Sequence, residues 1–287
     1  MTLPRTLAAL SAAALLATAL VSTQSLAAQA AVPDLTLVSQ TTGPTSDTSQ
    51  QAGAFCPLGP DTHVTGVGAE VVGGRGQTSL TMYTNIEREH GTAAAVEDAD
   101  GTADAWSVTG FAICATTPYR PTAVQFSPTD SSPSKTVTVA CPTGAVTTSG
   151  AGNGSSNTNS PLVLDDVIPS ADLKTVTVNV FEPQGGLTET WYAMAVARCG
   201  APLPGLQRVS ATSVSDSTNY KSVTATCPAG KKVVGTGHEI TGAQGQVYLD
   251  DVAPNPALTS VRVDAWEDQD GTAGNWSITA YAVCATP

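Results

Sequence analysis

The chain has 287 residues and a formal net charge of −12, although only 13% of its residues are charged. This acidic balance repels polyphosphates and anionic lipids, so it argues against nucleic-acid partners and against adsorption to a membrane surface. Six cysteines are present without any Cys-x-x-Cys pair, which argues against a zinc ribbon or a thioredoxin-like protein.

Residues 1–30 have the pattern of a signal peptide. Arg5 supplies a positive charge, Leu7–Val21 is an apolar run, and small residues around Ala27 and Ala30 fit a cleavage site. The apolar run is short for a membrane-spanning helix, and no later stretch is apolar enough to span a bilayer. The sequence therefore predicts a secreted, extracellular protein that is not inserted in a membrane after signal cleavage.

The rest of the chain consists of three similar copies of one unit. Trp106, Trp191 and Trp276 are 85 residues apart, and a cysteine follows each of them eight residues later. A glutamate precedes each tryptophan by nine residues, and a Cys-Pro pair marks the early part of each copy. We therefore expect three β repeats. Their predicted ranges are residues 31–118, 119–203 and 204–287, joined by short proline-rich segments.

Alternation with a period of two residues predicts β-strands in every copy. In Trp276–Cys284 the tryptophan and the cysteine share one face, and Asp270-Gly271 before them is typical of a hairpin turn. The expected fold is all-β, with three tandem small antiparallel β-sandwich-like repeats of about 85 residues. The alternative is one pseudo-threefold, β-prism-like body, because outward residues such as Phe111 are too apolar for a wet surface.

Each copy is expected to contain one internal disulfide, since it has one inward cysteine early and another at its end. The cysteines concerned are Cys56, Cys114, Cys141, Cys199, Cys227 and Cys284. Closing a loop of 57 or 58 residues stabilises a thin β core by about 4 kcal/mol. The core residues expected beside these bridges are Trp106, Trp191 and Trp276.

These units resemble those of a group of exported actinobacterial β-repeat proteins with the pattern Cys-Pro-x-Gly … Gly-x-Gly … Trp … Ala-x-Cys. The last copy shows it as CPAGKKVVGTG and NWSITAYAVC. The resemblance covers nearly all of the chain after residue 30, and the first and middle copies depart from the pattern, the middle one with Arg198 before its last cysteine. It implies a β-rich secreted module and carries over no activity.

Two acidic hairpin turns are candidates for a calcium site, because calcium binds six to eight oxygens. Their aspartates are Asp98, Asp100, Asp268 and Asp270. The remaining ligands of an EF-hand loop are missing, and the middle copy has no aspartate in this turn. We therefore expect no cofactor and no metal, with calcium as the weaker alternative.

No pattern of catalytic residues stands out. The sequence has no His-Glu-x-x-His and no Gly-x-Ser-x-Gly, and its three histidines do not recur at equivalent positions. We expect a secreted non-catalytic protein, a binding or structural module at the cell surface or in the extracellular space. Its expected partner is a cell-wall or extracellular glycan or a protein. The alternatives are a secreted hydrolase with carboxylate catalysis and an inhibitor of an extracellular protein.

The predicted binding surface is the hairpin end of the last two copies, where outward aromatics lie beside carboxylates. Such a surface suits stacking on a sugar ring, and repeated copies suit multivalent attachment. The residues are Trp266, Phe181, Tyr248, Glu267, Asp250, Asp251, Asp165 and Asp166.

Overall fold

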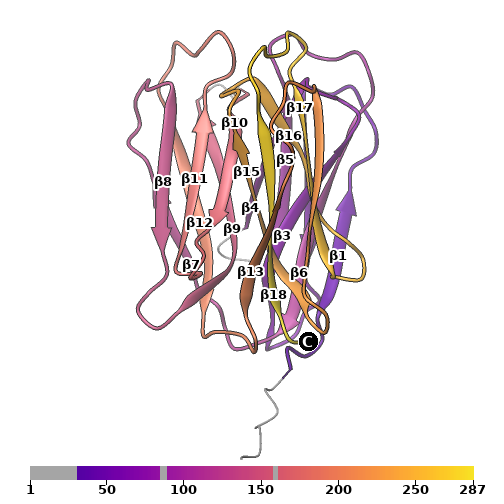
Figure 1. The fold of residues 1–287 in the computed structure, drawn as a ribbon, viewed down its shortest axis with the longest axis vertical. Helices are drawn as coiled ribbons and strands as arrows, with labels where there is room; N and C mark the ends of the chain where they lie inside the picture. Colours follow the sequence, from indigo (N-terminus) through magenta and orange to yellow (C-terminus); the bar gives the residue numbers. More distant parts are fainter. Residues whose placement is uncertain (1–30, 85–88, 158–160) are drawn as a thin grey trace, which may run out of the picture.

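A computed structural model describes residues 31–84, 89–157 and 161–287, without the side chains of residues 81–84. The predicted signal peptide, residues 1–30, lies outside the described residues. All regular structure in these ranges is β-strand, and the strands run along the long axis of the molecule (Figure 1). The described part of the chain contains no helix that is long and apolar enough to cross a membrane.

Each repeat contributes six strands. The first repeat forms β1 (Thr36–Thr41), β2 (Ser49–Phe55), β3 (Thr62–Val72), β4 (Thr78–Thr84), β5 (His90–Glu97) and β6 (Ser107–Thr116). The second forms β7 (Thr122–Phe126), β8 (Ser134–Ala140), β9 (Val146–Ser156), β10 (Val163–Pro169), β11 (Thr175–Phe181) and β12 (Trp191–Gly200). The third forms β13 (Gln207–Thr212), β14 (Tyr220–Thr226), β15 (Lys232–Thr241), β16 (Val247–Pro254), β17 (Ser260–Glu267) and β18 (Ser277–Ala285).

These strands form three six-stranded antiparallel sheets, and each sheet joins two repeats. We name each sheet after the repeats that it joins. Sheet 1/3 has the order β1-β6-β3-β16-β17-β14, sheet 2/3 has β13-β18-β15-β10-β11-β8, and sheet 1/2 has β2-β5-β4-β9-β12-β7. In Figure 1 the strands β8, β11, β10 and β15 of sheet 2/3 lie side by side across the boundary between two repeats.

The prediction of three tandem sandwiches, each complete in itself, is wrong. Within each repeat two three-stranded halves do pack face to face, but each half continues into a different neighbouring repeat. The physical reason is that the inner strand of a three-stranded half would expose unpaired backbone groups, some of which the inner strand of the next repeat satisfies over one or two residue pairs. The topology agrees with the alternative in that the copies share sheets and a core.

The inner strands β3, β9 and β15 converge on the pseudo-threefold axis that relates the repeats. At this crossing a Cβ atom added to Gly235 would lie 1.7 Å from the carbonyl oxygen of Thr148, and one added to Gly66 would lie 2.6 Å from Gly235 Cα. The Thr148 hydroxyl donates a hydrogen bond of 2.7 Å to the Thr65 carbonyl oxygen. The first and third repeats have glycine at this position because the backbones of the inner strands approach closely here.

The predicted disulfides and core tryptophans are confirmed. The bridges are Cys56–Cys114, Cys141–Cys199 and Cys227–Cys284, and no described cysteine is free. All three tryptophan side chains have 0% exposure. Three disulfides in one chain are typical of proteins that leave the cytoplasm.

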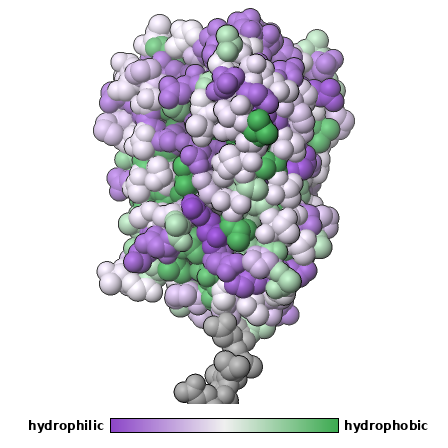
Figure 2. Space-filling model, viewed as in Figure 1, coloured by the Kyte–Doolittle hydropathy of each residue, from purple (hydrophilic) through white to green (hydrophobic). Residues whose placement is uncertain are grey.

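On the other face of the tryptophan strands, the apolar residues next to the cysteines are also buried, whereas Phe111 and Met194 are partly exposed. Ile113, Val196 and Val283 are at most 2% exposed, and Ile113 and Val196 belong to one hydrophobic cluster that spans the repeats. Contact with neighbouring repeats therefore explains why this face is too apolar for solvent. On the side of the molecule shown in Figure 2, hydrophobic residues appear only as small separate areas among polar ones.

Candidate functional site

The repeated glutamate accepts a hydrogen bond from the buried indole of its own repeat. Glu97, Glu182 and Glu267 each accept a hydrogen bond from a tryptophan Nε1, at 2.9, 2.9 and 2.7 Å. The second carboxylate oxygen of Glu267 accepts the amide of Thr272 in the following loop at 3.2 Å. Glu267, predicted as a binding residue, is therefore occupied in fixing its hairpin to the core.

The turns that follow these glutamates come from three repeats and meet around one pocket of about 260 Å³ at the hairpin end. We call it the axial pocket, because the pseudo-threefold axis relates its walls. The predicted calcium candidates Asp98, Asp100, Asp268 and Asp270 all line it. The second repeat supplies an uncharged wall of residues 183–185. The fold thus brings together aspartates that lie about 170 positions apart in the sequence.

Two of these aspartates are held by the turns that carry them. Asp98 Oδ1 accepts the Gly101 amide at 2.9 Å, and Asp268 Oδ1 accepts the Gly271 amide at the same distance. Burial raises the pKa of both carboxyl groups, and the turn amides act in the opposite direction. Within the described ranges, no group of three or more His, Cys, Asp or Glu side chains is arranged to hold a metal ion.

Among the residues that the structure describes, Tyr248 is the one aromatic that lines the axial pocket. Its side chain is 4% exposed, and its hydroxyl has no hydrogen-bond partner among the described residues. Burial raises the pKa of this phenol, and the charges of Asp98, Asp268 and Asp100 add to the effect. The phenol is therefore neutral at ordinary pH and offers both a donor and an acceptor to the pocket.

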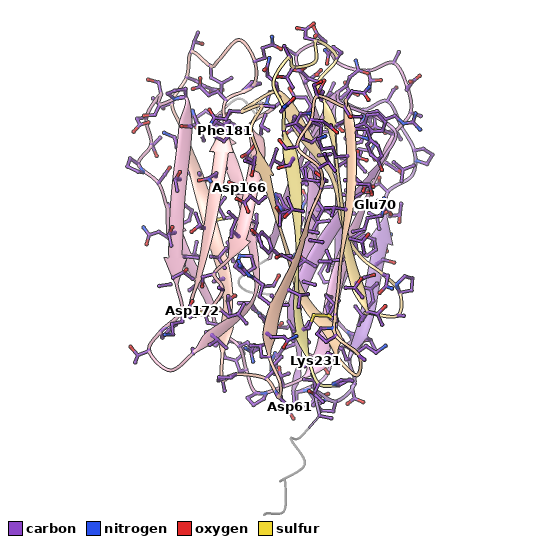
Figure 3. All side chains as sticks on the ribbon, viewed as in Figure 1. Asp61, Glu70, Asp166, Asp172, Phe181 and Lys231 are labelled. Carbon is purple, nitrogen blue, oxygen red and sulfur yellow. A yellow bond between two sulfur atoms is a disulfide. The ribbon has the colours of Figure 1, made fainter. Side chains whose placement is uncertain are left out.

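A larger groove of about 1150 Å³ crosses sheet 1/3. We call it the sheet groove. The residues that line it include Leu37, Ser39, Glu70, Phe111, Thr224 and Arg262, which come from five strands of the two repeats. Arg262 Nη2 is 3.0 Å from Glu70 Oε1, and both side chains are partly exposed, at 40% and 30%. Figure 3 labels Glu70 in the upper part of the molecule.

Buried carboxylates lie beside this arginine. Asp251 Oδ2 is 2.8 Å from Arg262 Nη2, and Asp264 also pairs with the guanidinium. Burial, with Asp250 and Asp264 acting in the same direction, raises the pKa of Asp251 to about 9 despite Arg262. Burial and Asp264 raise the pKa of Asp250 to about 7. One guanidinium serves several carboxyl groups, so part of this cluster stays protonated at neutral pH.

Trp266 belongs to the same neighbourhood, because its side chain interacts with Asp250. The ring of Trp266 packs on Tyr220 with centroids 4.3 Å apart, and the Arg75 guanidinium lies 5.6 Å from the ring centroid. Of the predicted binding residues, Trp266, Asp250 and Asp251 are therefore brought together, but the two aspartates are mostly buried rather than presented to solvent.

The remaining predicted residues lie on sheet 2/3. Asp165 and Asp166 are 4% and 5% exposed, so neither forms an open surface. Burial, together with Asp166 and Glu239, raises the pKa of Asp165 well above its ordinary value, and burial raises that of Asp166 to about 6. Phe181 is half-buried and lies toward the upper end of the molecule in Figure 3, as does Asp166. The predicted set does not form one continuous surface.

Sheet 2/3 has a face that corresponds to the sheet groove of sheet 1/3, but it carries different residues at the equivalent positions. Strand pairing makes Arg208 the counterpart of Leu37 and Tyr281 the counterpart of Phe111. Arg208 lies 4.6 Å over the Tyr281 ring and also donates to the Pro169 carbonyl oxygen, so its side chain spans that face. The shorter side chain of Leu37 cannot span the equivalent face in this way. The face of sheet 1/3 is therefore left open.

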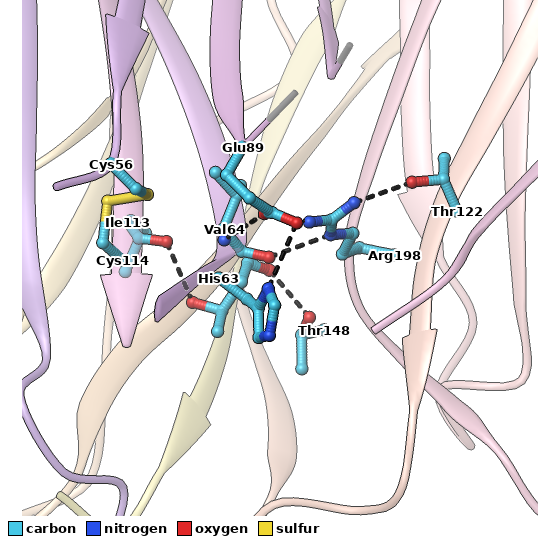
Figure 4. A network of polar contacts seen from close by, with 10 residues as sticks. Cys56, His63, Val64, Glu89, Ile113, Cys114, Thr122, Thr148 and Arg198 are labelled. Atoms are coloured by element: carbon cyan, nitrogen blue, oxygen red, sulfur yellow. Dashed lines mark hydrogen bonds and ion pairs between the residues drawn. A yellow bond between two sulfur atoms is a disulfide. The ribbon is translucent and has the colours of Figure 1, made fainter. Parts of the chain in front are cut away.

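A third polar cluster joins repeats 1 and 2 (Figure 4). Arg198 is 2% exposed and donates to the Val64 carbonyl oxygen at 3.0 Å and to the Thr122 hydroxyl at 2.8 Å. It also pairs with Glu89, which accepts the Val64 amide at 2.8 Å and contacts His63. Each of the three guanidinium nitrogens therefore has a partner in the protein, so this cluster fastens the two repeats together.

Sequence reasoning missed Glu70, Phe111 and Arg262 as site residues. One signal was present: in β17 the alternation places Arg262 on the face opposite to the buried valines. The sequence did not indicate that this face would lie beside β3 and β6 of the first repeat. Two-residue alternation shows which face a residue occupies, but it does not identify the strand that pairs with it.

No family model matches the chain. A curated protein with a matching segment is Shufflon protein B' of Escherichia coli, which is 37% identical over 75 residues. The matched segment is 26% of this chain and 16% of that protein, so the chain spans only a small part of its relative.

Proposed function

We propose that the protein is a secreted, non-catalytic binding protein that holds an extended, uncharged glycan in the sheet groove. The observation that supports this most strongly is the groove itself, an open trough of about 1150 Å³ that crosses from one repeat into another. Its size exceeds the range of most small-ligand pockets, which favours a chain-like ligand over a compact one.

The residues at the bottom of the sheet groove have the chemical groups that a sugar ring can bind. A half-buried ring, Phe111, offers an apolar face for the C–H side of a pyranose. The Glu70 carboxylate accepts hydrogen bonds and Arg262 donates them, so the pair can serve hydroxyl groups that do both. Ser39 and Thr224 add hydroxyl groups at the walls.

The charge of the molecule favours an uncharged ligand over a polyanion. The net charge of −12 repels acidic polymers, and the arginine in the groove is already paired with carboxylates. Export is supported by the three disulfides, which are stable in oxidising compartments.

The test is retention of the full chain on insoluble polysaccharides and cell-wall fractions, followed by affinity measurement with a soluble fragment of the retaining polymer. Phe111→Ala should weaken binding by about tenfold, the loss expected for about 1.4 kcal/mol of stacking. Phe126→Ala is the matched control, because Phe126 is an exposed aromatic at 51% on sheet 1/2, outside the groove. Equal affinities for the two variants, or no retention of the native protein on any polymer, would rule the proposal out.

One observation favours a carboxylate hydrolase as a second candidate. Glu70 and Asp251 both contact Arg262 Nη2, at 3.0 and 2.8 Å, so the two carboxyl groups lie close together beside the groove. Glycosidases use such pairs, but here an arginine lies between them and neutralises their charge. We expect no release of reducing ends from any retained polymer. Turnover that Glu70→Gln abolishes would favour the hydrolase instead.

A further inference from the structure

We propose that the axial pocket binds an organic cation, an alkylammonium or guanidinium group of about the size of a lysine or arginine side chain. This site is separate from the sheet groove, because the two share no lining residue.

The first argument is the charge of the pocket walls. Four aspartates from two repeats line a volume of about 260 Å³, and none of the described residues that line it is a lysine or an arginine. The Gln269 amide donates to the Asp100 carboxylate across the boundary between the first and third repeats. The negative charge of this pocket is therefore not neutralised by a basic side chain in its wall.

The second argument is the unpartnered hydroxyl of Tyr248. The residue as a whole is more than nine-tenths buried and lines the pocket, and its hydroxyl has no hydrogen-bond partner among the residues that the structure describes. The ring is packed in the protein and the hydroxyl is not among the fully buried unpaired atoms, so the phenol is available to a ligand group in the pocket. An ammonium group has three N–H donors and can bind the phenol oxygen and carboxylates together.

The position of Tyr248 also indicates that each molecule has one such site, because the equivalent positions of the other repeats hold other residues. Strand equivalence places Val163 at the matching position of the second repeat and Ser79 at that of the first. Neither is aromatic, and the Ser79 hydroxyl already donates to the Leu162 carbonyl oxygen. At these three equivalent positions, only the third repeat has a phenol.

The arrangement of the carboxylates favours an organic cation over a bare metal ion. They surround the pocket, and among the described side chains no three acidic groups come close enough to hold one metal ion. The volume equals that of about nine water molecules in the liquid, which accommodates several carbon atoms as well as the charged group.

The experiment is isothermal titration of the full chain at low ionic strength with two probes. Pentylammonium represents a free amine, and the acetylated and amidated peptide Gly-Lys-Gly represents a lysine of a protein partner. We expect saturable binding with one site per chain for at least one probe, weakening as salt is added. The probe that binds more tightly identifies the source of the cation.

Two variants test the named contacts. Tyr248→Phe should weaken binding about fivefold, the loss typical of one hydrogen bond, and Asp270→Asn about threefold to tenfold through loss of one charge. Asp61→Asn is the matched control, because Asp61 lies at the opposite end of the molecule (Figure 3). Both pocket variants should keep the native unfolding midpoint and native retention on polysaccharides, which separates this proposal from the glycan proposal.

The proposal is overturned if neither probe saturates, or if Tyr248→Phe and Asp270→Asn bind as tightly as Asp61→Asn. Stoichiometric binding of calcium that displaces the organic probes would also overturn it, since the pocket would then be a metal site.

Discussion

A tryptophan that is fully buried still has one polar atom, the indole Nε1, and that atom needs an acceptor. In this protein the acceptor is a glutamate nine positions earlier in each repeat. The sequence shows the spacing, but not the contact, because a hairpin loop lies between the two residues and interrupts the alternation. The recurrence of the glutamate therefore reflects the architecture of the repeat, and the predicted binding role of Glu267 has a structural alternative.

Removing this acceptor should destabilise the protein. Glu182→Ala leaves the Trp191 N–H buried and unpaired, so we expect the free energy of unfolding to fall by about 1–3 kcal/mol. Glu182→Gln keeps an acceptor and should lose less. Denaturant unfolding with intact disulfides measures both, and Asp172→Ala, at an exposed loop carboxylate, is the control. Equal stabilities for Glu182→Ala and the control would contradict the structural role.

The buried carboxyl groups of the shared sheets predict a pH dependence of opposite sign to that of ordinary salt bridges. The pKa values of Asp251, Asp250 and Asp166 are raised to about 9, 7 and 6 by burial and neighbouring acids. Between about pH 4 and these values the folded protein holds more protons than the unfolded chain. The free energy of unfolding should therefore be highest near pH 4 and fall as the pH rises.

Each extra proton held by the folded state contributes a slope of about 1.4 kcal/mol per pH unit. Asp251→Asn removes one such group, so its unfolding free energy should fall less steeply between about pH 4 and pH 9. Denaturant titrations across this range measure the slope, with Asp61→Asn as control. A slope in Asp251→Asn as steep as in the control would show that Asp251 is ionised in the folded protein.

At the scale of strands, the sequence predicts well which face of a strand is buried, but it predicts poorly which strand lies next to it. The alternation in β17 and in the tryptophan strands correctly predicted which side chains point inward, and the repetition of the unit predicted that cysteines pair within repeats. It did not reveal that β3 pairs with β16, β10 with β15 and β4 with β9 across repeats. A period of two is the same whether the adjacent strand comes from the same repeat or from the next one.

The glycines of the inner strands test this account of the junctions. Gly235→Ala places a Cβ atom against the backbone of β9, which cannot move without disturbing a sheet, so we expect a loss of at least about 3 kcal/mol. Gly43→Ala is the control, because nothing lies within 4 Å of the Cβ position there. Thermal unfolding of both variants provides the measurement. A tolerated Gly235→Ala would mean that the inner strands are further apart than described.

At the scale of the whole molecule, a threefold scaffold carries sites that are not threefold. The repeat length and the disulfides were predictable from the spacing of tryptophan and cysteine, and the β class from the two-residue alternation. The sites were not, because each uses residues from different repeats: Glu70 and Arg262 meet in the sheet groove, and Asp98 and Tyr248 in the axial pocket. Single residue differences at equivalent positions then distinguish one sheet from another, as with Leu37 on sheet 1/3 and Arg208 on sheet 2/3.

The central claim is that three repeats unfold as one body because every sheet belongs to two of them. Differential scanning calorimetry of the full chain with intact disulfides tests it most directly. We predict one transition with a van't Hoff enthalpy equal to the calorimetric enthalpy. Two or three resolved transitions, or a calorimetric enthalpy about three times the van't Hoff value, would show instead that the repeats unfold independently.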